Sequence, residues 1–240
     1  MTDSIKLKTE LGKLINVQKA TLDKLSEGIA VFGTDGRLRI HNASFATIWN
    51  FSEDDLENTP RFSDLINLCL PLYNNPDFWN SLRARATNPN PQIRHHDSGE
   101  IIRSDNRIFT WLSRPLPDGA TLLAWEDVTS ARKAQAALIE RAEAFLSKGK
   151  YNDARVELIN LKHPEALELY KKANDALAKI NLAQAEARFS AKEYGAAQEH
   201  LELASQFGAT AEEIKDVRSI GRKFREEHKQ SQMSTKKSPK

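Results

Sequence analysis

The segment Leu22–Asn42, LDKLSEGIAVFGTDGRLRIHN, decides how this chain folds. Its two short runs, IAVF and LRIH, flank Asp35-Gly36, a pair typical of a hairpin turn because glycine accepts a positive φ. Asn42 then precedes the apolar face of a short helix and can cap it through its side-chain oxygen. The segment therefore predicts a β-hairpin that leads into a helix.

A second informative segment, Leu116–Thr129, reads LPDGATLLAWEDVT and closes the same region. Turn residues and apolar runs predict three strands here, at residues 100–103, 107–114 and 120–126. Between the two segments the pattern favours short helices, at residues 54–57, 62–70 and 77–86. The region therefore holds two strands, several small helices and three further strands.

This order of elements, with the two quoted segments, resembles the PAS sensor domain, in the version that precedes the catalytic half of many bacterial sensor histidine kinases. The resemblance covers residues 22–129 and is carried by the two ends, since residues 50–96 hold no matching motif. It implies an α+β fold with a PAS-like five-stranded antiparallel sheet and small helices over residues 27–127, followed by an all-α region.

The triplet DVT at Asp127–Thr129 resembles the junction motif of the family, in which the carboxylate and the hydroxyl tie the last strand to the outgoing helix. Asp127 and Thr129 are therefore the candidate signalling residues. An ordinary helix N-cap would use the same chemistry and is the alternative.

The resemblance also implies a cavity between the sheet and the small helices, which in the family holds a cofactor, a metabolite or nothing. Phe109, Trp111 and Trp125 lie on the last two predicted strands and could stack on a planar ligand there. Aromatic pairs across antiparallel strands more often pack against each other, and we favour that interpretation. The identity of a cofactor is therefore unknown.

The cysteine and histidine residues of this region do not match known cofactor sites. Cys69 lies in the apolar context NLCLP, which predicts a buried, inert thiol rather than the reactive one of flavin photoreceptors. His95 and His96 fall in a loop and point to opposite sides of an extended chain, so we expect no metal site.

The chain lacks motifs of phosphate-binding loops, dinucleotide folds, zinc proteases and serine hydrolases. Kinase relatives carry a phosphoacceptor histidine on the helix after the sensor domain, but residues 130–162 contain no histidine. His163 precedes Pro164, which interrupts a helix. We therefore expect a protein that is not an enzyme.

Composition sets the class of protein. The 240 residues carry a formal charge of +2 and one cysteine, and no apolar run approaches the roughly 18 residues that span a bilayer. We expect a cytoplasmic protein without a membrane span and without a nucleic-acid partner. The basic cluster at Arg218, Arg222, Lys223 and Arg225 is diluted by acidic neighbours and predicts a solvated helix face.

Helical periodicity flanks the sensor-like region on both sides. Apolar residues three and four apart predict an amphipathic helix over residues 1–26 and a linker helix over residues 128–146. The narrow stripe on each helix is typical of a coiled-coil seam, so a homodimer through these helices is expected. Packing of each helix on its own domain is the alternative.

An internal repeat follows, because AEAFLSKGKYNDARVEL at Ala142–Leu158 aligns with AEARFSAKEYGAAQEHL at Ala185–Leu201, an offset of 185 − 142 = 43 residues. Both copies look like the turn between the paired helices of a tetratricopeptide repeat. The matching positions are Tyr151, Ala154, Tyr194 and Ala197. The second copy replaces Gly149 by Lys192, and the offset exceeds the usual period of 34 residues.

The repeat predicts a tetratricopeptide-like region over residues 142–227 that binds a protein partner, followed by a disordered basic tail over residues 228–240. The whole chain is thus expected to be a non-enzymatic signalling protein. Two alternatives stay open: a truncated or split component of a sensor histidine kinase acting with a separate catalytic chain, and a scaffold whose sensor cavity is filled by its own side chains.

Overall fold

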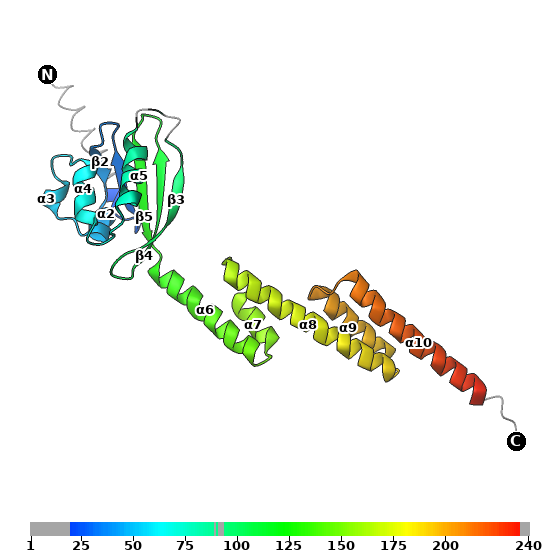
Figure 1. Cartoon of the computed structure of the whole chain (residues 1–240). Helices are drawn as coiled ribbons and strands as arrows, with labels where there is room; N and C mark the ends of the chain where they lie inside the picture. Colours follow the sequence, from blue (N-terminus) through cyan, green and yellow to red (C-terminus); the bar gives the residue numbers. More distant parts are fainter. Residues whose placement is uncertain (1–19, 89, 91–93, 236–240) are drawn as a thin grey trace. The chain divides into compact units, whose positions relative to one another are not determined.

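The structure, a computed structural model, describes residues 20–88, 90 and 94–235 (Figure 1). The chain divides into two compact units, Met1–Arg132 and Lys133–Lys240. Most of the helix predicted over residues 1–26 lies outside the described residues, although residues 20–22 are helical. The unit boundary falls five residues later than the predicted domain end at 127, because the first turn of the linker helix belongs to the first unit.

A five-stranded antiparallel sheet forms the first unit and confirms the predicted fold class. Its strands are β1 (Gly28–Phe32), β2 (Leu38–His41), β3 (Asp97–Ile102), β4 (Ile108–Pro115) and β5 (Thr121–Asp127). The order across the sheet is β2-β1-β5-β4-β3, so the first and last strands pair at its centre. The two segments that predicted the fold are therefore neighbours in space, with Gly28 opposite Trp125.

Four short helices cover one face of this sheet (Figure 1). They are α2 (Ala43–Trp49), α3 (Glu53–Leu56), α4 (Phe62–Cys69) and α5 (Pro76–Thr87). Asn42, Ser52 and Asn75 cap three of them through side-chain oxygens that accept backbone hydrogen bonds. The predicted short helices are confirmed to within one residue at each end.

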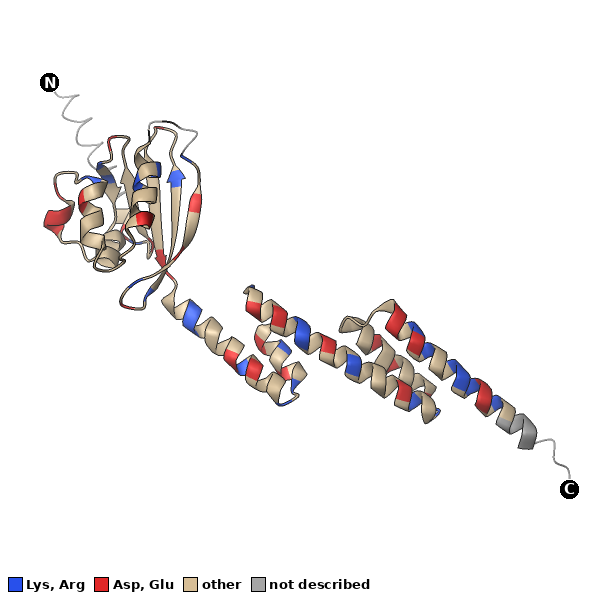
Figure 2. Cartoon of the chain, in the orientation of Figure 1, with Lys and Arg blue, Asp and Glu red and all other residues tan. Residues whose placement is uncertain are grey.

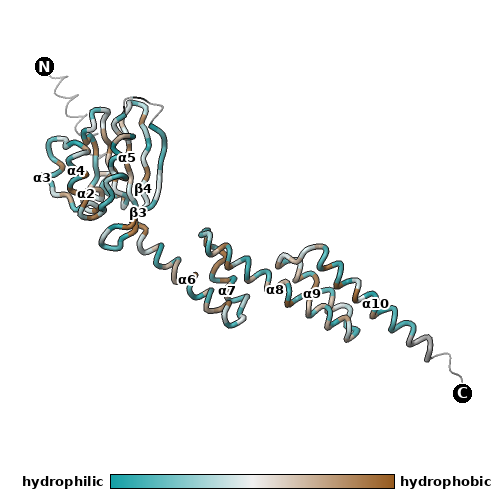
Figure 3. Tube along the Cα trace, viewed as in Figure 1, coloured by the Kyte–Doolittle hydropathy of each residue, from teal (hydrophilic) through white to brown (hydrophobic). Residues whose placement is uncertain are grey.

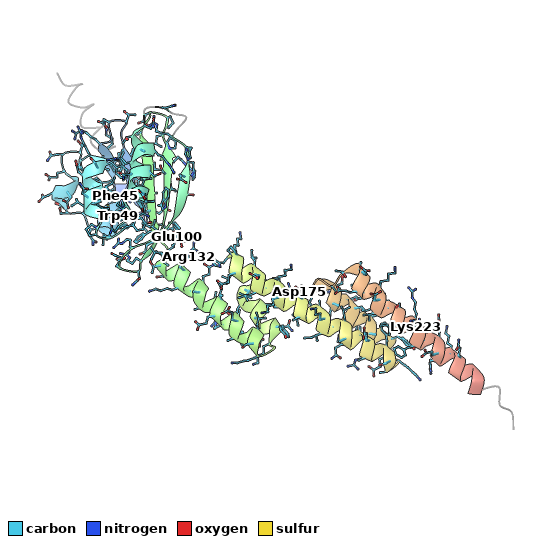
Figure 4. The ribbon with its side chains drawn as sticks, viewed as in Figure 1. Phe45, Trp49, Glu100, Arg132, Asp175 and Lys223 are labelled. Atoms are coloured by element: carbon cyan, nitrogen blue, oxygen red, sulfur yellow. The ribbon has the colours of Figure 1, made fainter. Side chains whose placement is uncertain are left out.

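Aromatic rings fill the space between the sheet and the helices. Trp49 and Trp79 come from α2 and α5 and pack on Trp125 of β5, with ring centroids 5.0 Å and 6.0 Å away. All three side chains are at most 2% exposed. Figure 4 labels Phe45 and Trp49, the ends of the inward face of α2. A Cβ atom on Gly28 would lie 3.0 Å from the Phe45 Cα atom, so glycine allows α2 to approach β1 closely.

Asn42 is fully buried and uses every polar atom of its side chain. The Oδ1 atom accepts from the Ile29 amide at 2.8 Å and from the Phe45 amide at 3.0 Å. The Nδ2 group donates to the Leu22 carbonyl at 2.9 Å and to the Glu27 carbonyl at 2.8 Å. The predicted cap therefore also joins β1, α2 and the segment before β1.

Arg103 is a second buried polar side chain, only 3% exposed. Its guanidinium donates to the Ile48 carbonyl near the end of α2 and to Asp105 Oδ2 at 2.6 Å in the β3–β4 turn. The same group lies 5.1 Å from the Phe109 ring centroid. Arg103 thus offsets the cost of burying its charge with a carboxylate, a helix-end carbonyl and an aromatic face.

The second unit is entirely helical in its described part. It contains α7 (Tyr151–Leu158), α8 (Pro164–Ser190), α9 (Tyr194–Gln206), α10 (Ala211–Thr235) and most of α6 (Thr129–Ser147). α8 and α9 run side by side (Figure 1), while the tube of α10 is mostly polar (Figure 3). Because α10 continues to Thr235, the predicted start of a disordered tail at 228 is wrong; residues 236–240 lie outside the described part.

The 43-residue repeat is a repeat of structure as well as of sequence. Gly149 and Lys192 both take a left-handed conformation, with φ of 69° and 67°. Their amides donate to Leu146 and Phe189, which are themselves 43 residues apart. Three pairs of side chains at this offset are buried to the same extent: Ala142 with Ala185, Ala154 with Ala197, and Leu158 with Leu201.

Replacing Asn42 by Ala should destabilise the first unit by about 3 kcal/mol, because two buried amides and two carbonyls lose their partner. All four tryptophans lie in the first unit, so denaturant unfolding followed by Trp fluorescence reports on this unit alone. Asn80→Ala, at an exposed position of α5, is the control and should change stability by less than about 0.5 kcal/mol. Equal effects of the two substitutions would contradict this account.

The repeated turn gives a test of backbone strain, because nothing lies within 4 Å of a Cβ atom built on Gly149. Gly149→Ala should cost about 1 kcal/mol, since the left-handed conformation penalises a side chain. Lys192→Gly should instead stabilise the second unit, by about 0.5 kcal/mol. Thermal unfolding followed by far-UV circular dichroism measures both effects, with Trp fluorescence as a reference for the first unit. Shifts of the same sign would show that packing, not strain, governs these turns.

Candidate functional site

The end of β5 and the start of α6 are joined by a compact set of hydrogen bonds. Asp127 is the last residue of β5 and Thr129 is the first of α6. The Thr129 amide donates to Asp127 Oδ1 at 2.9 Å, and Thr129 Oγ1 accepts from the Ile108 amide at 2.9 Å. The Val128 amide donates to the Ile108 carbonyl, also at 2.9 Å. The two predicted junction residues therefore meet each other and the start of β4.

Arg107 completes this junction from the β3–β4 turn. Its guanidinium donates to Asp127 Oδ2, with the Nε atom at 3.0 Å, and lies 5.1 Å from the Phe109 ring centroid. Partial burial acts to raise the pKa of Asp127, but the hydrogen bonds from Thr129 and the charge of Arg107 outweigh it and hold the pKa below its ordinary value. The carboxylate is therefore ionised at neutral pH.

A second tie holds the first turn of α6 to the edge of the sheet. Arg132 donates to Glu100 Oε2 on β3 through Nε at 2.8 Å and Nη2 at 2.7 Å (Figure 4). Arg132 lies three residues after Thr129, so both residues are on the same face of α6. The start of α6 is thus bonded to β4 through Thr129 and to β3 through Arg132.

Glu100 and Arg132 also line a groove on the sheet. The groove has a volume of about 560 Å³, and its other charged or polar residues include Glu27, Thr110 and Glu126. Glu126 is exposed and precedes Asp127 on β5. The groove places charged side chains beside the ties that hold α6.

Sequence reasoning missed Arg107, Glu100 and Arg132, because their partners are 20 and 32 residues away in the chain. The only local signal is the spacing of three residues between Thr129 and Arg132 at the start of the predicted linker helix.

The predicted ligand-cavity residues are part of the aromatic packing. Phe109 and Trp125 are at most 1% exposed, and Trp111 is partly buried with its ring centroid 6.2 Å from that of Trp125. Trp49 and Trp79 occupy the space over Trp125. Trp111 and Trp125 also line the groove that Glu100 and Arg132 border.

The structure also describes the surroundings of Cys69 and of the side chains that could bind a metal. Cys69 is buried, and that burial raises the pKa of its thiol well above the ordinary range, although the charge of Arg103 partly opposes this. Among the described residues, no group of three or more His, Cys, Asp and Glu side chains is arranged to hold a metal ion.

The predicted repeat-turn residues divide into two kinds. Ala154 and Ala197 are fully buried and allow close approach of neighbouring helices. Tyr151 packs against the cluster around Ala154, whereas Tyr194 is partly exposed and lines a pocket with residues of α10.

None of the helices in the described part is both long and apolar enough to cross a membrane.

The junction should respond to substitution in a graded way. Asp127→Asn keeps an acceptor for the Thr129 amide but loses the ion pair with Arg107, so it should cost about 0.5 kcal/mol. Thr129→Val removes the acceptor of the Ile108 amide and should cost about 1–2 kcal/mol. Trp-monitored unfolding gives both values, and a larger cost for Asp127→Asn would contradict this ranking.

The lowered pKa of Asp127 also sets a pH window for the junction. A depressed pKa stabilises the folded state above the ordinary value of about 3.9 and loses this effect as pH falls through the folded value. Hydrogen exchange of the first-turn amides of α6 should therefore show no loss of protection from neutral pH to about pH 4 in wild type. In Asp127→Asn the protection of these amides should be lower at every pH. It should also not change with pH where the Asp127 carboxylate of the wild type titrates, because asparagine does not ionise.

Comparisons with known proteins agree with this geometry. Residues 22–136 match the family model described as the PAS fold. The sensor protein DivL of Caulobacter vibrioides is 48% identical over 145 residues, which are 60% of this chain and 19% of that protein. The chain therefore spans about one fifth of the length of this relative.

Solved structures resemble the same region at low identity. The PAS domain of Bordetella pertussis BvgS is 13% identical and covers 55% of this chain and 98% of its own, with a TM-score of 0.40. A domain of a sensory box sensor histidine kinase/response regulator from Geobacter sulfurreducens is 16% identical and covers 49% and 96%, with a TM-score of 0.33. These scores are too low to carry an argument. Residues 22–136, just under half of this chain, are thus similar to the PAS fold family and contain the five-stranded sheet, and 145 residues of the chain are homologous to a sensor protein.

Proposed function

We propose that this chain is a non-enzymatic signalling protein whose PAS domain controls the start of α6 and whose helical unit binds a protein partner. The observation that carries the proposal is the double tie of α6, to β4 through Thr129 and to β3 through Arg132. When a ligand or partner binds the first unit and shifts β3 or β4, the bonds that Thr129 and Arg132 make to these strands become stronger or weaker. Coupling of about 1–3 kcal/mol is the usual scale for such communication.

The helical unit supports the second half of the proposal. Its two copies of one turn, at Gly149 and Lys192, and its paired buried alanines are features of stacked helix pairs. We assign this stack a tetratricopeptide-like role, in which side chains on its surface hold a segment of another protein. Homodimerisation through α6 and the N-terminal segment, and the cytoplasmic location suggested by a single cysteine, belong to the same proposal.

The proposal predicts that loosening one tie changes the behaviour of α6. Glu100→Gln removes the charge that Arg132 contacts and should raise amide hydrogen exchange in the first turns of α6 about threefold to tenfold. Glu126→Gln is the matched control, because it removes the same charge from the same groove and leaves in place Glu100, the carboxylate that Arg132 contacts. Both variants should keep the Trp fluorescence of the wild type. Indistinguishable exchange in the two variants would remove the support for a control point at this tie.

A second candidate function is a component of a sensor histidine kinase that acts with a separate catalytic chain. The observation in its favour is that the homologous segment makes up 19% of a longer sensor protein. A phosphotransfer assay with kinases of the same organism separates the two candidates. Phosphorylation of this chain in that assay would favour the second, whereas changed partner binding without phosphorylation would favour the first.

A further inference from the structure

One face of α10 carries a row of positive charges. Lys215, Arg218, Arg222, Arg225 and Lys229 are spaced alternately by three and four residues, so they follow one side of the helix (Figure 2). All five side chains are exposed. Among the described residues, none of the five is in an ion pair with a carboxylate.

The acidic residues of α10 do not neutralise this row. At about 100° per residue, Asp216 and Glu227 lie on the far side of the helix, whereas Glu226 borders the row and Glu212 lies three residues before its first member, Lys215. Glu213 is engaged at the start of α10, where its carboxylate accepts from the Thr210 amide at 2.7 Å. The row is therefore a surface of unbalanced positive charge, although the charge of the whole chain is only +2.

The centre of the row is hollowed into a pocket of about 260 Å³. Arg218, Arg222 and Arg225 line it from α10, and Tyr194 and Gln198 line it from α9. The Arg225 Cζ atom lies 4.8 Å from the Tyr194 ring centroid. The Tyr194 hydroxyl is buried and has no hydrogen-bond partner in the described part of the chain. A polar atom without a partner thus belongs to a side chain that lines the same pocket as three arginines.

Phe189 and Gly221 give the pocket an apolar floor. Gly221 faces the Phe189 ring of α8, and a Cβ atom on Gly221 would lie 2.7 Å from that ring. α10 therefore rests directly on Phe189, which holds the arginine side of the helix beside Tyr194. Such a floor accepts the methylene groups of a side chain while the guanidinium groups bind its charged end.

These features fit a carboxylate on a protein better than a nucleic acid. Guanidinium groups bind planar carboxylates through paired hydrogen bonds, and the tyrosine hydroxyl can donate a further one. From residue 215 to residue 229 the row is about 21 Å long, the length of a short helix. A single row bordered by Glu226, on a chain close to neutral, lacks the broad basic surface that phosphate backbones need.

We propose that the Arg218, Arg222 and Arg225 face of α10 binds an acidic segment of a protein partner and places one carboxylate beside the Tyr194 hydroxyl. This assignment replaces the expectation of a merely solvated helix face. It rests on the proposed function, because it names the surface and the chemistry through which the helical unit holds its partner.

The test uses the full chain and a synthetic helical peptide with glutamates three and four residues apart, followed by fluorescence anisotropy at constant ionic strength. Arg222→Gln should weaken peptide binding about fivefold to tenfold, and Arg218→Gln combined with Arg225→Gln about fiftyfold. Lys223→Gln is the matched control, since it removes one charge from a position about 100° around the helix from Arg222, outside the row, and should change affinity less than about twofold. Tyr194→Phe removes only the hydroxyl and should weaken binding about threefold to tenfold.

Several outcomes would overturn the proposal. They are equal losses in Arg222→Gln and Lys223→Gln, equal binding of a peptide with glutamine in place of glutamate, and tighter binding of a single-stranded oligonucleotide than of the acidic peptide. Far-UV circular dichroism confirms that each variant keeps its helices. Because the exchange experiment on Glu100 does not involve α10, failure here leaves the proposed control of α6 to be judged separately.

Discussion

The buried amide of Asn42 is the interaction on which the first unit depends. It joins the chain before β1, β1 itself and the first turn of α2 with four hydrogen bonds. With these groups placed, β1 lies between β2 and the central strand β5, and the whole length of β1 pairs with β5. α6 begins directly after the end of β5. The Asn42 side chain, near the start of the domain, therefore helps to determine where α6 leaves the domain.

Two arginines of this domain each connect the β3–β4 turn to another element. Arg103 bridges α2 and the β3–β4 turn, and Arg107 bridges the same turn and the end of β5. Both arginines also lie over the Phe109 ring, one buried and one more exposed. The β3–β4 turn is therefore connected both to the interior of the domain, through Arg103, and to the end of β5 where α6 begins, through Arg107.

Local patterns were enough to predict the strands and the short helices, because alternation, the Asp-Gly turn and the capping residues act within a few residues of each other. The 43-residue repeat was also visible, since a duplicated turn keeps its small and aromatic residues. The tie from Arg132 to Glu100 was not predictable, because it depends on which strand forms the sheet edge. The pocket beside Tyr194 needed the packing of α10 on Phe189, and the length of α10 was underestimated because its polar end has no apolar stripe.

The environment of Cys69 has a practical consequence for studies in solution. The thiol is the only one in the sequence, it is buried at the last residue of α4, and its raised pKa keeps it protonated at neutral pH. Thiolate is the form that reacts with maleimides and similar reagents. A cysteine introduced on an exposed helix would therefore take a spin label or dye selectively in the otherwise native chain, so distances between the two units can be measured without first removing Cys69.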